Sequence, residues 1–97
     1  MTPFKELDPL LHSQLRLAVM SVLISVDRAD FTYLREKTEA TAGNLSVQIG
    51  KLKDAGYISV SKSFGESYPK TMCSITDLGR RRFAEYVAAL NDYLRPG

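Results

Sequence analysis

The sequence predicts an α+β fold, mainly helical, with a three-helix core, a two-stranded β-hairpin and a long final helix. Apolar residues recur at helical spacing in residues 8–26, in residues 42–55 and after residue 77. Apolar and polar residues alternate in between, as they do in half-buried strands. A chain of 97 residues suits one core, so we expect residues 1–97 to form a single domain.

The first helix is predicted over residues 8–26. Asp8 is a capping carboxylate, and Pro9 suits the first helical position, where no N–H is needed. Apolar residues line two nearly opposite faces of this helix, so both faces must be covered. The second face carries Leu17, Met20 and Ile24. In so short a chain, we expect another subunit to cover it.

A helix-turn-helix is predicted over residues 32–56. The polar run 27–30 interrupts the helical pattern, and Thr32 is the expected cap of a short second helix that turns Leu34 inward. The connection that follows, residues 39–41, lacks glycine. A non-glycine residue must therefore adopt any left-handed conformation there, at a modest cost.

The third helix is predicted over residues 42–55. The hydroxyl group of Thr41 can cap its start. Gly56 fits the left-handed position just past its end, and Tyr57 can then pack back on Leu52.

A hairpin is predicted over residues 57–76, with strands around Ile58–Ser61 and Lys70–Ile75 and a loop of turn-forming residues between them. A last helix is predicted over residues 77–95, capped by Thr76 and Asp77. Its apolar stripe consists of Phe83, Val87, Leu90 and Leu94, flanked by Tyr86 and Tyr93.

Two helices joined by a short turn and followed by a two-stranded hairpin suggest a winged helix-turn-helix, in which the hairpin is the wing. The chain resembles the small single-domain winged-helix regulators related to the MarR and ArsR groups over nearly its whole length. The most specific matching blocks are "GNLS…LKDAGYI" and "ITDLGRRRF". The resemblance implies a prokaryotic, cytoplasmic, homodimeric transcriptional regulator.

The third helix is expected to be the recognition helix, lying in the major groove of DNA. Leu45, Ile49 and Leu52 share its buried face, and the opposite face is small, polar and basic. Glycine inside a helix costs about 1 kcal/mol relative to alanine, so Gly43 and Gly50 suggest a purpose beyond folding. Small residues let the helix backbone approach a duplex closely. The alternative is a solvated face with two tolerated glycines.

Specific DNA contacts are expected from both the helix and the wing. Asn44 and Gln48 are candidate base readers, Val47 a contact for a thymine methyl group, and Lys51 a phosphate contact. The complete predicted set is Thr41, Gly43, Asn44, Ser46, Val47, Gln48, Lys51, Lys62 and Lys70.

The distribution of charge gives weak support to DNA binding. Residues 43–82 hold seven basic and three acidic residues, an excess of +4 against a net charge of +2 for the chain. Most charged runs are simply solvated surface, and Glu66 in the wing loop repels phosphate. Phe64 and Tyr68 in that loop are expected to pack the hairpin against the body.

Dimerisation is expected through the first and last helices, by way of Leu17, Met20, Ile24, Leu90, Tyr93 and Leu94. Two recognition helices would then enter successive major grooves about 34 Å apart on a pseudo-palindromic operator. Repression by occlusion of a promoter is the expected outcome, because no activation segment is recognisable.

Other functions find less support. No nucleophile–base arrangement, metal cluster, cofactor motif or membrane span is recognisable, so an enzyme is disfavoured and no cofactor is expected. The single cysteine, Cys73, is expected to be a small buried residue in a reducing compartment. The low net charge and Glu66 favour one alternative, a winged-helix adaptor that binds protein instead of DNA. No small-molecule effector can be identified from the residues.

Overall fold

The computed structural model describes residues 4–63 and 70–96. The elements follow in the order α1 (Gln14–Val26), β1 (Arg28–Asp30), α2 (Phe31–Thr38), α3 (Ala42–Asp54), β2 (Ile58–Ser63), β3 (Lys70–Ile75) and α4 (Asp77–Leu94). The expected mainly helical α+β fold is confirmed, and its element order is that of a winged helix.

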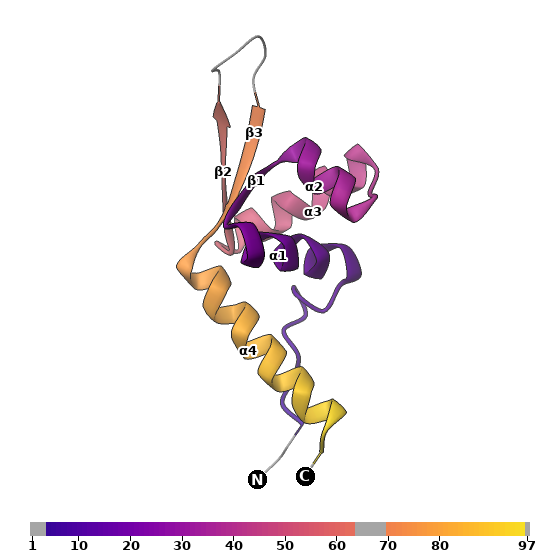
Figure 1. Cartoon of the computed structure of the whole chain (residues 1–97). Helices are drawn as coiled ribbons and strands as arrows, with labels where there is room; N and C mark the ends of the chain where they lie inside the picture. Colours follow the sequence, from indigo (N-terminus) through magenta and orange to yellow (C-terminus); the bar gives the residue numbers. More distant parts are fainter. Residues whose placement is uncertain (1–3, 64–69, 97) are drawn as a thin grey trace.

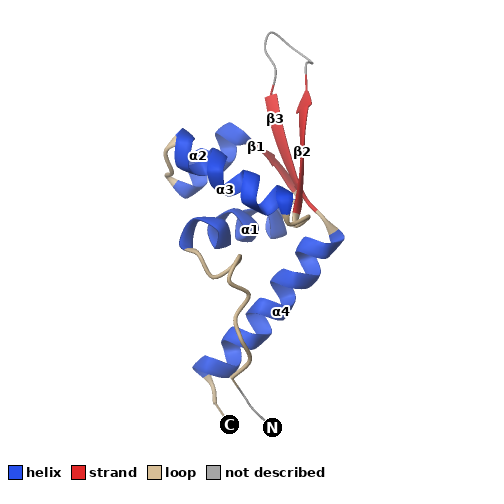
Figure 2. Ribbon diagram, turned by 180° about the vertical axis from the view of Figure 1, so that it is seen from behind, coloured by secondary structure: helices blue, strands red, loops and turns tan. Residues whose placement is uncertain are grey.

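The strands form one antiparallel sheet in the order β1-β3-β2. Helices α1, α2 and α3 lie together on one side of this sheet, and the β2–β3 wing extends beyond them (Figure 1). Helix α4 leaves the sheet in the opposite direction and runs beside the N-terminal segment (Figure 2). The wing and the chain termini therefore mark opposite ends of a molecule that extends 56 Å along its longest axis.

The third strand, β1, was not expected. Residues 27–30 were predicted only to interrupt the helical pattern, but Asp27 adopts a φ of 70° and the chain then pairs with β3. Ala29 is buried opposite Cys73 in this pairing. A strand of three residues alternates too briefly to produce a recognisable pattern, which explains the difference.

The first helix begins at Gln14, not at residue 8 as predicted. The capping signal of Asp8 is used by a separate turn, in which its carboxylate accepts a hydrogen bond from the Leu10 N–H at 2.9 Å. The chain then takes an extended conformation at Ser13 before α1 starts. Leu11 is fully buried in this turn, so packing of one side chain outweighs continuation of the helix.

The cap of α2 also differs from the prediction. The Asp30 carboxylate accepts a hydrogen bond from the Tyr33 N–H at 2.7 Å, so α2 starts at Phe31 and Thr32 lies inside it. The left-handed residue expected in the connection is Glu39, with a φ of 56°.

Both ends of α3 form as expected. Thr41 accepts a hydrogen bond from the Asn44 N–H at 3.2 Å. At the other end, Gly56 has a φ of 82° and the Tyr57 N–H donates to the Leu52 carbonyl at 3.0 Å. This pairing is the Schellman motif, which satisfies free carbonyls at a helix end.

The core lies between the sheet and the three helices. Met20, predicted at the dimer surface, is 0% exposed within a single chain and belongs to this core. A side chain with no exposed surface has nothing to offer a partner, so that assignment is wrong. The largest fully buried side chains are Leu11, Met20, Leu23, Leu34, Leu45, Leu52, Val19 and Cys73.

Phenol groups connect the N-terminal segment to the rest of the chain. The Tyr57 hydroxyl donates to the Asp8 carboxylate at 2.6 Å, and the Tyr93 hydroxyl donates to the Lys5 carbonyl at 2.8 Å. Burial, and then the neighbouring Asp8 carboxylate, raise the pKa of Tyr57 to about 12. These contacts attach the segment to α4 and to the start of β2.

Candidate nucleic-acid interface

Helix α3 divides into a buried face and an open face. Leu45, Ile49 and Leu52 are buried against the core. On the opposite side, the Val47 side chain is 56% exposed. The other predicted contacts Gly43, Asn44, Ser46 and Lys51 are exposed as well.

The two glycines of α3 have open space around them. A Cβ atom placed on Gly43 or Gly50 would meet no atom within 4 Å. Packing within the described part of the chain therefore gives no reason for either glycine, although alanine would be the better helix former. A large partner that needs close approach to the helix backbone would give one.

The start of α3 is suited to negative charge. Its first turn contains no acidic residue, and Lys51 and Lys53 lie in its last turn. Free N–H groups at a helix start carry partial positive charge, which favours phosphate. Thr41 lies at this end and is exposed.

Gln48 is not free on the open face. Its carbonyl oxygen accepts a hydrogen bond from an Nη atom of Arg16 on α1, and its amide nitrogen donates to the Asn44 carbonyl oxygen at 3.1 Å. Gln48 is also half-buried. The sequence patterns did not point to a role for Arg16 at this surface. One signal was available, because Arg16 is the only charged residue of α1.

The wing offers its two predicted lysines on different faces. Lys62 pairs with Thr71 and shares the helix-covered face of the sheet with Val60. Lys70 is on the other face, and both lysines are exposed. Lys62 therefore lies on the same side of the hairpin as α3. Phe64, Glu66 and Tyr68 of the wing loop lie outside the described residues.

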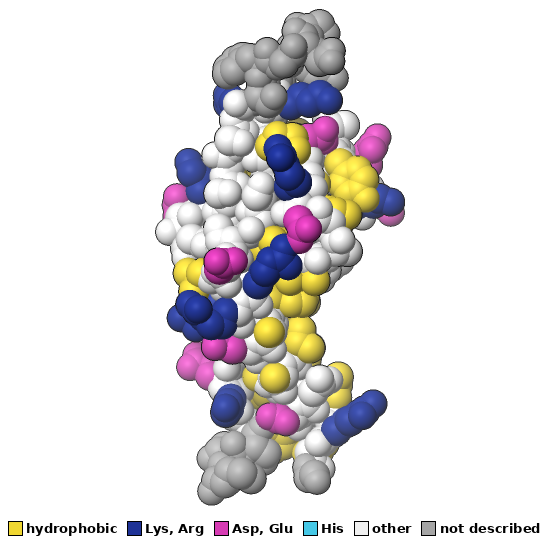
Figure 3. All heavy atoms as spheres, turned by 60° about the vertical axis from the view of Figure 1, so that its left-hand side comes forward, with side chains coloured by type: hydrophobic (Ala, Val, Ile, Leu, Met, Phe, Trp, Pro, Cys, Tyr) yellow, Lys and Arg dark blue, Asp and Glu magenta, His cyan; other side chains and the backbone are white. Residues whose placement is uncertain are grey.

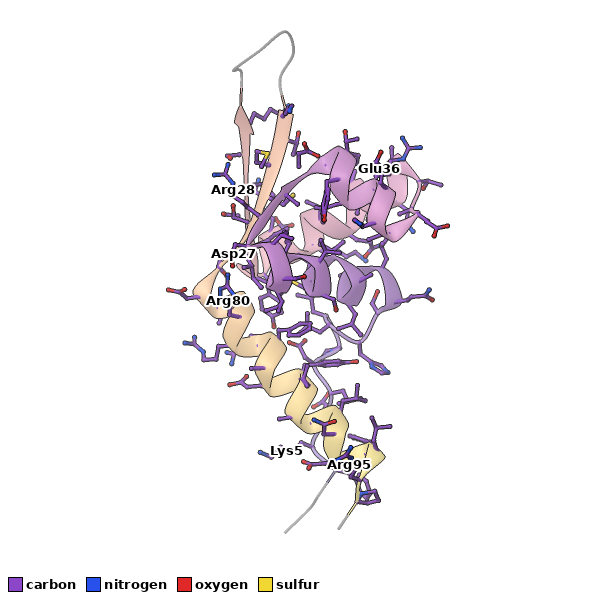
Figure 4. The ribbon with its side chains drawn as sticks, in the orientation of Figure 1. Lys5, Asp27, Arg28, Glu36, Arg80 and Arg95 are labelled. Atoms are coloured by element: carbon purple, nitrogen blue, oxygen red, sulfur yellow. The ribbon has the colours of Figure 1, made fainter. Side chains whose placement is uncertain are left out.

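The arginines at the start of α4 are partly neutralised. Arg80 forms an ion pair with Asp27, and Arg82 contacts Glu85 at 2.9 Å. Arg28 projects from the sheet on the side away from α2 and α3, near this pair (Figure 4). On the face shown in Figure 3, basic and acidic side chains are interspersed, so no uniform basic surface forms there.

The apolar stripe of α4 is open to solvent along much of its length. Leu94 is 69% exposed and Val87 is 40% exposed, whereas Leu90 is half-buried. Apolar side chains gather over the α4 half of the molecule in Figure 3. Leu17 and Ile24 of α1 are also half-buried.

Tyr93, another predicted dimer residue, is held by the N-terminal segment. Its ring centroid lies 5.1 Å from that of Phe4, and its hydroxyl is bonded to the Lys5 carbonyl.

The described residues show neither a metal site nor a membrane-spanning helix. Within residues 4–63 and 70–96, no group of three or more His, Cys, Asp and Glu is placed to hold a metal ion. No helix in these ranges has the length and apolarity needed to cross a membrane. Burial raises the pKa of the Cys73 thiol to about 11, which disfavours a reactive thiolate.

Comparison with known sequences identifies relatives of this arrangement. Residues 15–94 match the family described as the winged helix DNA-binding domain. An uncharacterised protein of Methanocaldococcus jannaschii is 33% identical over 76 residues, which cover 78% of this chain and 83% of that protein.

Solved structures share the fold. A transcriptional regulator homologue protein from Pyrococcus horikoshii has a TM-score of 0.83 and 26% identity, covering 88% of this chain and 84% of that one. NadR, solved in complex with 4-hydroxyphenylacetate, has a TM-score of 0.73 and 16% identity, covering 89% of this chain and 63% of its own. YusO from Bacillus subtilis has a TM-score of 0.72 and 17% identity, covering 91% of this chain and 58% of its own.

Proposed function

The chain belongs to the winged helix DNA-binding domain family, and on this premise we propose that it is a homodimeric, sequence-specific repressor of transcription. The winged-helix family that the sequence suggested is confirmed by the family match over residues 15–94. In the proposal, α3 enters the major groove of double-stranded DNA, and the wing lies along the backbone.

The open face of α3 is the observation that carries the proposal. Gly43 and Gly50 leave space beside the helix, and Val47 exposes more than half of its surface. Two glycines weaken a helix whose open face meets only water. They become favourable when a duplex covers that face, because the backbone and the valine methyl groups then contact base edges.

Two copies of the chain are proposed to associate through α4 and α1. The exposed stripe around Val87 and Leu94 is apolar and lies on a helix that extends away from the core. Exposed apolar surface of this kind is typical of an interaction site. A two-fold interface uses the same patch on both copies, so the stripe on one α4 would pack against its counterpart, with Leu17, Ile24 and Leu90 at its edge.

A dimer places two recognition helices on one side of the duplex. Successive major grooves are about 34 Å apart, so a pseudo-palindromic operator suits this arrangement. Occupation of a promoter would block polymerase, and this would take place in the cytoplasm, where the chromosome of a prokaryote lies.

The experiment is selection of bound duplexes from random DNA, followed by affinity measurements on the selected site between 50 and 200 mM salt. We expect a pseudo-palindromic consensus and an affinity that falls on the order of a thousandfold over this range, because bound phosphates release counterions. Light scattering on the free protein should give twice the mass of the 10.8 kDa chain.

Failure to enrich any sequence, together with an affinity that does not respond to salt, would contradict DNA binding. Co-purification of a protein partner under the same conditions would then favour the adaptor alternative.

A further inference from the structure

We propose that Arg16 is a positioning residue that sets which bases Asn44 can read, an inference that rests on the proposed binding of α3 to DNA. Arg16 belongs to α1 and contacts Gln48 of α3. It reaches the open face of α3 through a chain of hydrogen bonds that passes from a guanidinium group to two side-chain amides.

The chain of hydrogen bonds has three parts. The Arg16 Nε–H donates to the Leu10 carbonyl at 2.6 Å, which holds the guanidinium against the turn before α1. An Arg16 Nη–H donates to the Gln48 carbonyl oxygen. The Gln48 amide nitrogen then donates to the Asn44 carbonyl oxygen at 3.1 Å, one helical turn earlier on α3.

The donor-to-acceptor direction of these hydrogen bonds follows from the chemistry of arginine. A guanidinium is always charged and can only donate hydrogen bonds. The side of the Gln48 amide that faces Arg16 must therefore be its oxygen, which turns its NH₂ toward Asn44. By the same reasoning, Asn44 must turn its oxygen toward Gln48. Its own NH₂ then remains available on the exposed side of α3.

Without Arg16, neither amide has a preferred orientation. An amide can rotate by 180° and exchange its donor and acceptor at almost no cost in shape. An open cleft of about 410 Å³ borders Asn44 and Gln48, between α1 and the end of α2, so packing leaves room for such a rotation. The fixed donor character of Arg16 therefore decides the orientation of both amides.

The orientation of Asn44 has a consequence for sequence readout. An outward NH₂ group seeks an acceptor in the major groove, which guanine offers at O6 and N7, adenine at N7 and thymine at O4. Cytosine offers only the donor N4–H₂ at the same edge. At the position that Asn44 contacts, we therefore expect guanine, thymine or adenine to be bound in preference to cytosine.

The test is duplex selection with the full chain and a set of variants. Asn44→Ala first identifies the base position that depends on Asn44. Arg16→Met keeps the aliphatic stem but removes the donors, and should reduce the preference at that position about fivefold, the loss of one discriminating contact. Lys5→Gln removes the same charge at the far end of the molecule (Figure 4) and should change nothing at that position.

A second variant reverses the chain of hydrogen bonds. Gln48→Glu keeps the contact with Arg16, but a carboxylate cannot donate to Asn44. Asn44 must then turn its NH₂ toward residue 48 and its oxygen outward, so cytosine should become a preferred base and guanine and thymine should lose preference. The added negative charge lowers affinity for every duplex, so the preferences are compared within each variant.

The outcomes separate this inference from the proposed function. If the wild-type chain selects no sequence, the proposed function fails and the inference fails with it. If the wild type selects a site but Arg16→Met and Gln48→Glu keep its base preference, only the inference is overturned. A uniform loss of base preference at every position in Arg16→Met would indicate a merely structural role for Arg16 and would also overturn the inference. If Arg16→Met does not fold, as judged by circular dichroism, the Gln48→Glu preference decides.

Discussion

Gly79, in the first turn of α4, lies against the backbone of Tyr57. A Cβ atom placed on this glycine would stand 2.1 Å from the Tyr57 carbonyl oxygen. Thr76, the cap of α4, also donates from its hydroxyl to the Gly56 carbonyl at 2.6 Å. The start of α4 is thus attached to the junction between α3 and β2, and this attachment sets the direction of α4 relative to α3.

Gly79→Ala should therefore destabilise the protein. A distance of 2.1 Å is shorter than any real contact between a Cβ and an oxygen, and the neighbouring atom is backbone that cannot rotate away. Overpacking of this kind costs about 1–3 kcal/mol, and thermal unfolding followed by circular dichroism measures it. An unchanged or raised melting temperature would show that α4 can shift to accommodate the methyl group.

Gly50→Ala should have the opposite effect on stability. Its Cβ would meet no atom within 4 Å, so the gain in helix propensity, about 0.5–1 kcal/mol, is not opposed. Affinity for the selected DNA should nevertheless fall, because the added methyl group lies on the face proposed to contact the duplex. Urea unfolding measures the stability, and fluorescence anisotropy measures the affinity for the selected DNA. A stabilised variant that binds DNA as well as the wild type would remove the reason offered for this glycine.

Lys51→Ala and Asn44→Ala should weaken DNA binding in different ways. Loss of a phosphate contact lowers affinity for all duplexes alike and reduces the salt slope by about 1. Loss of a base contact costs about 1–3 kcal/mol on the preferred site and little on others. Titrations of both variants on the selected site and on a scrambled duplex distinguish these effects. Indistinguishable behaviour would contradict the separate roles.

Leu94→Asp should convert the proposed dimer into a monomer. Leu94 is the most exposed of the large apolar side chains described, and a carboxylate in its place would be buried without a partner on association. Asn91→Asp is the matched control, because it adds the same charge to an exposed position of the same helix. Sedimentation analysis measures the masses. Equal dissociation of both variants would point to charge alone, and a dimeric Leu94→Asp would place the interface elsewhere.

Tyr57 should make stability fall at alkaline pH. The folded state keeps the phenol protonated up to about pH 12, whereas the phenol of the unfolded chain titrates near 10. Between these values the unfolded state binds fewer protons, so stability decreases as the pH rises. Below pH 10 the contribution is fully present.

Tyr57→Phe removes this ionisation, and its unfolding free energy should depend less steeply on pH between 10 and 12. Tyr33→Phe, which removes an exposed phenol, is the control. Identical slopes for the wild type and Tyr57→Phe would indicate that the burial of the Tyr57 phenol and its contact with Asp8 do not persist in solution.

Capping residues and side-chain periodicity predicted helix ends and buried faces well where the hydrogen bonds involved join residues close in sequence. Thr41 and Gly56 mark the two ends of α3 because each completes hydrogen bonds within a few residues. The buried face of α3 follows from a spacing that holds along any regular helix. By contrast, Asp8 is a capping group as predicted, but it caps a separate turn and not the first helix, since burial of Leu11 ends that turn.

Contacts between distant residues account for what the residue pattern missed. Strand β1 forms because Ala29 pairs with Cys73, which lies 44 positions later in the sequence. Met20 is buried because the other helices and the sheet cover it. Arg16 and Gln48 are 32 positions apart, so no periodicity reveals that one directs the other.

The amino-acid order alone was thus enough for the number and order of the helices, the wing hairpin and the open side of α3, because backbone hydrogen bonding and side-chain period act over a few residues. Which apolar face is covered within one chain, and which amide is oriented by a distant guanidinium, depend on how those elements meet in space. Such contacts leave no repeating trace along the chain, and only the folded arrangement reveals them.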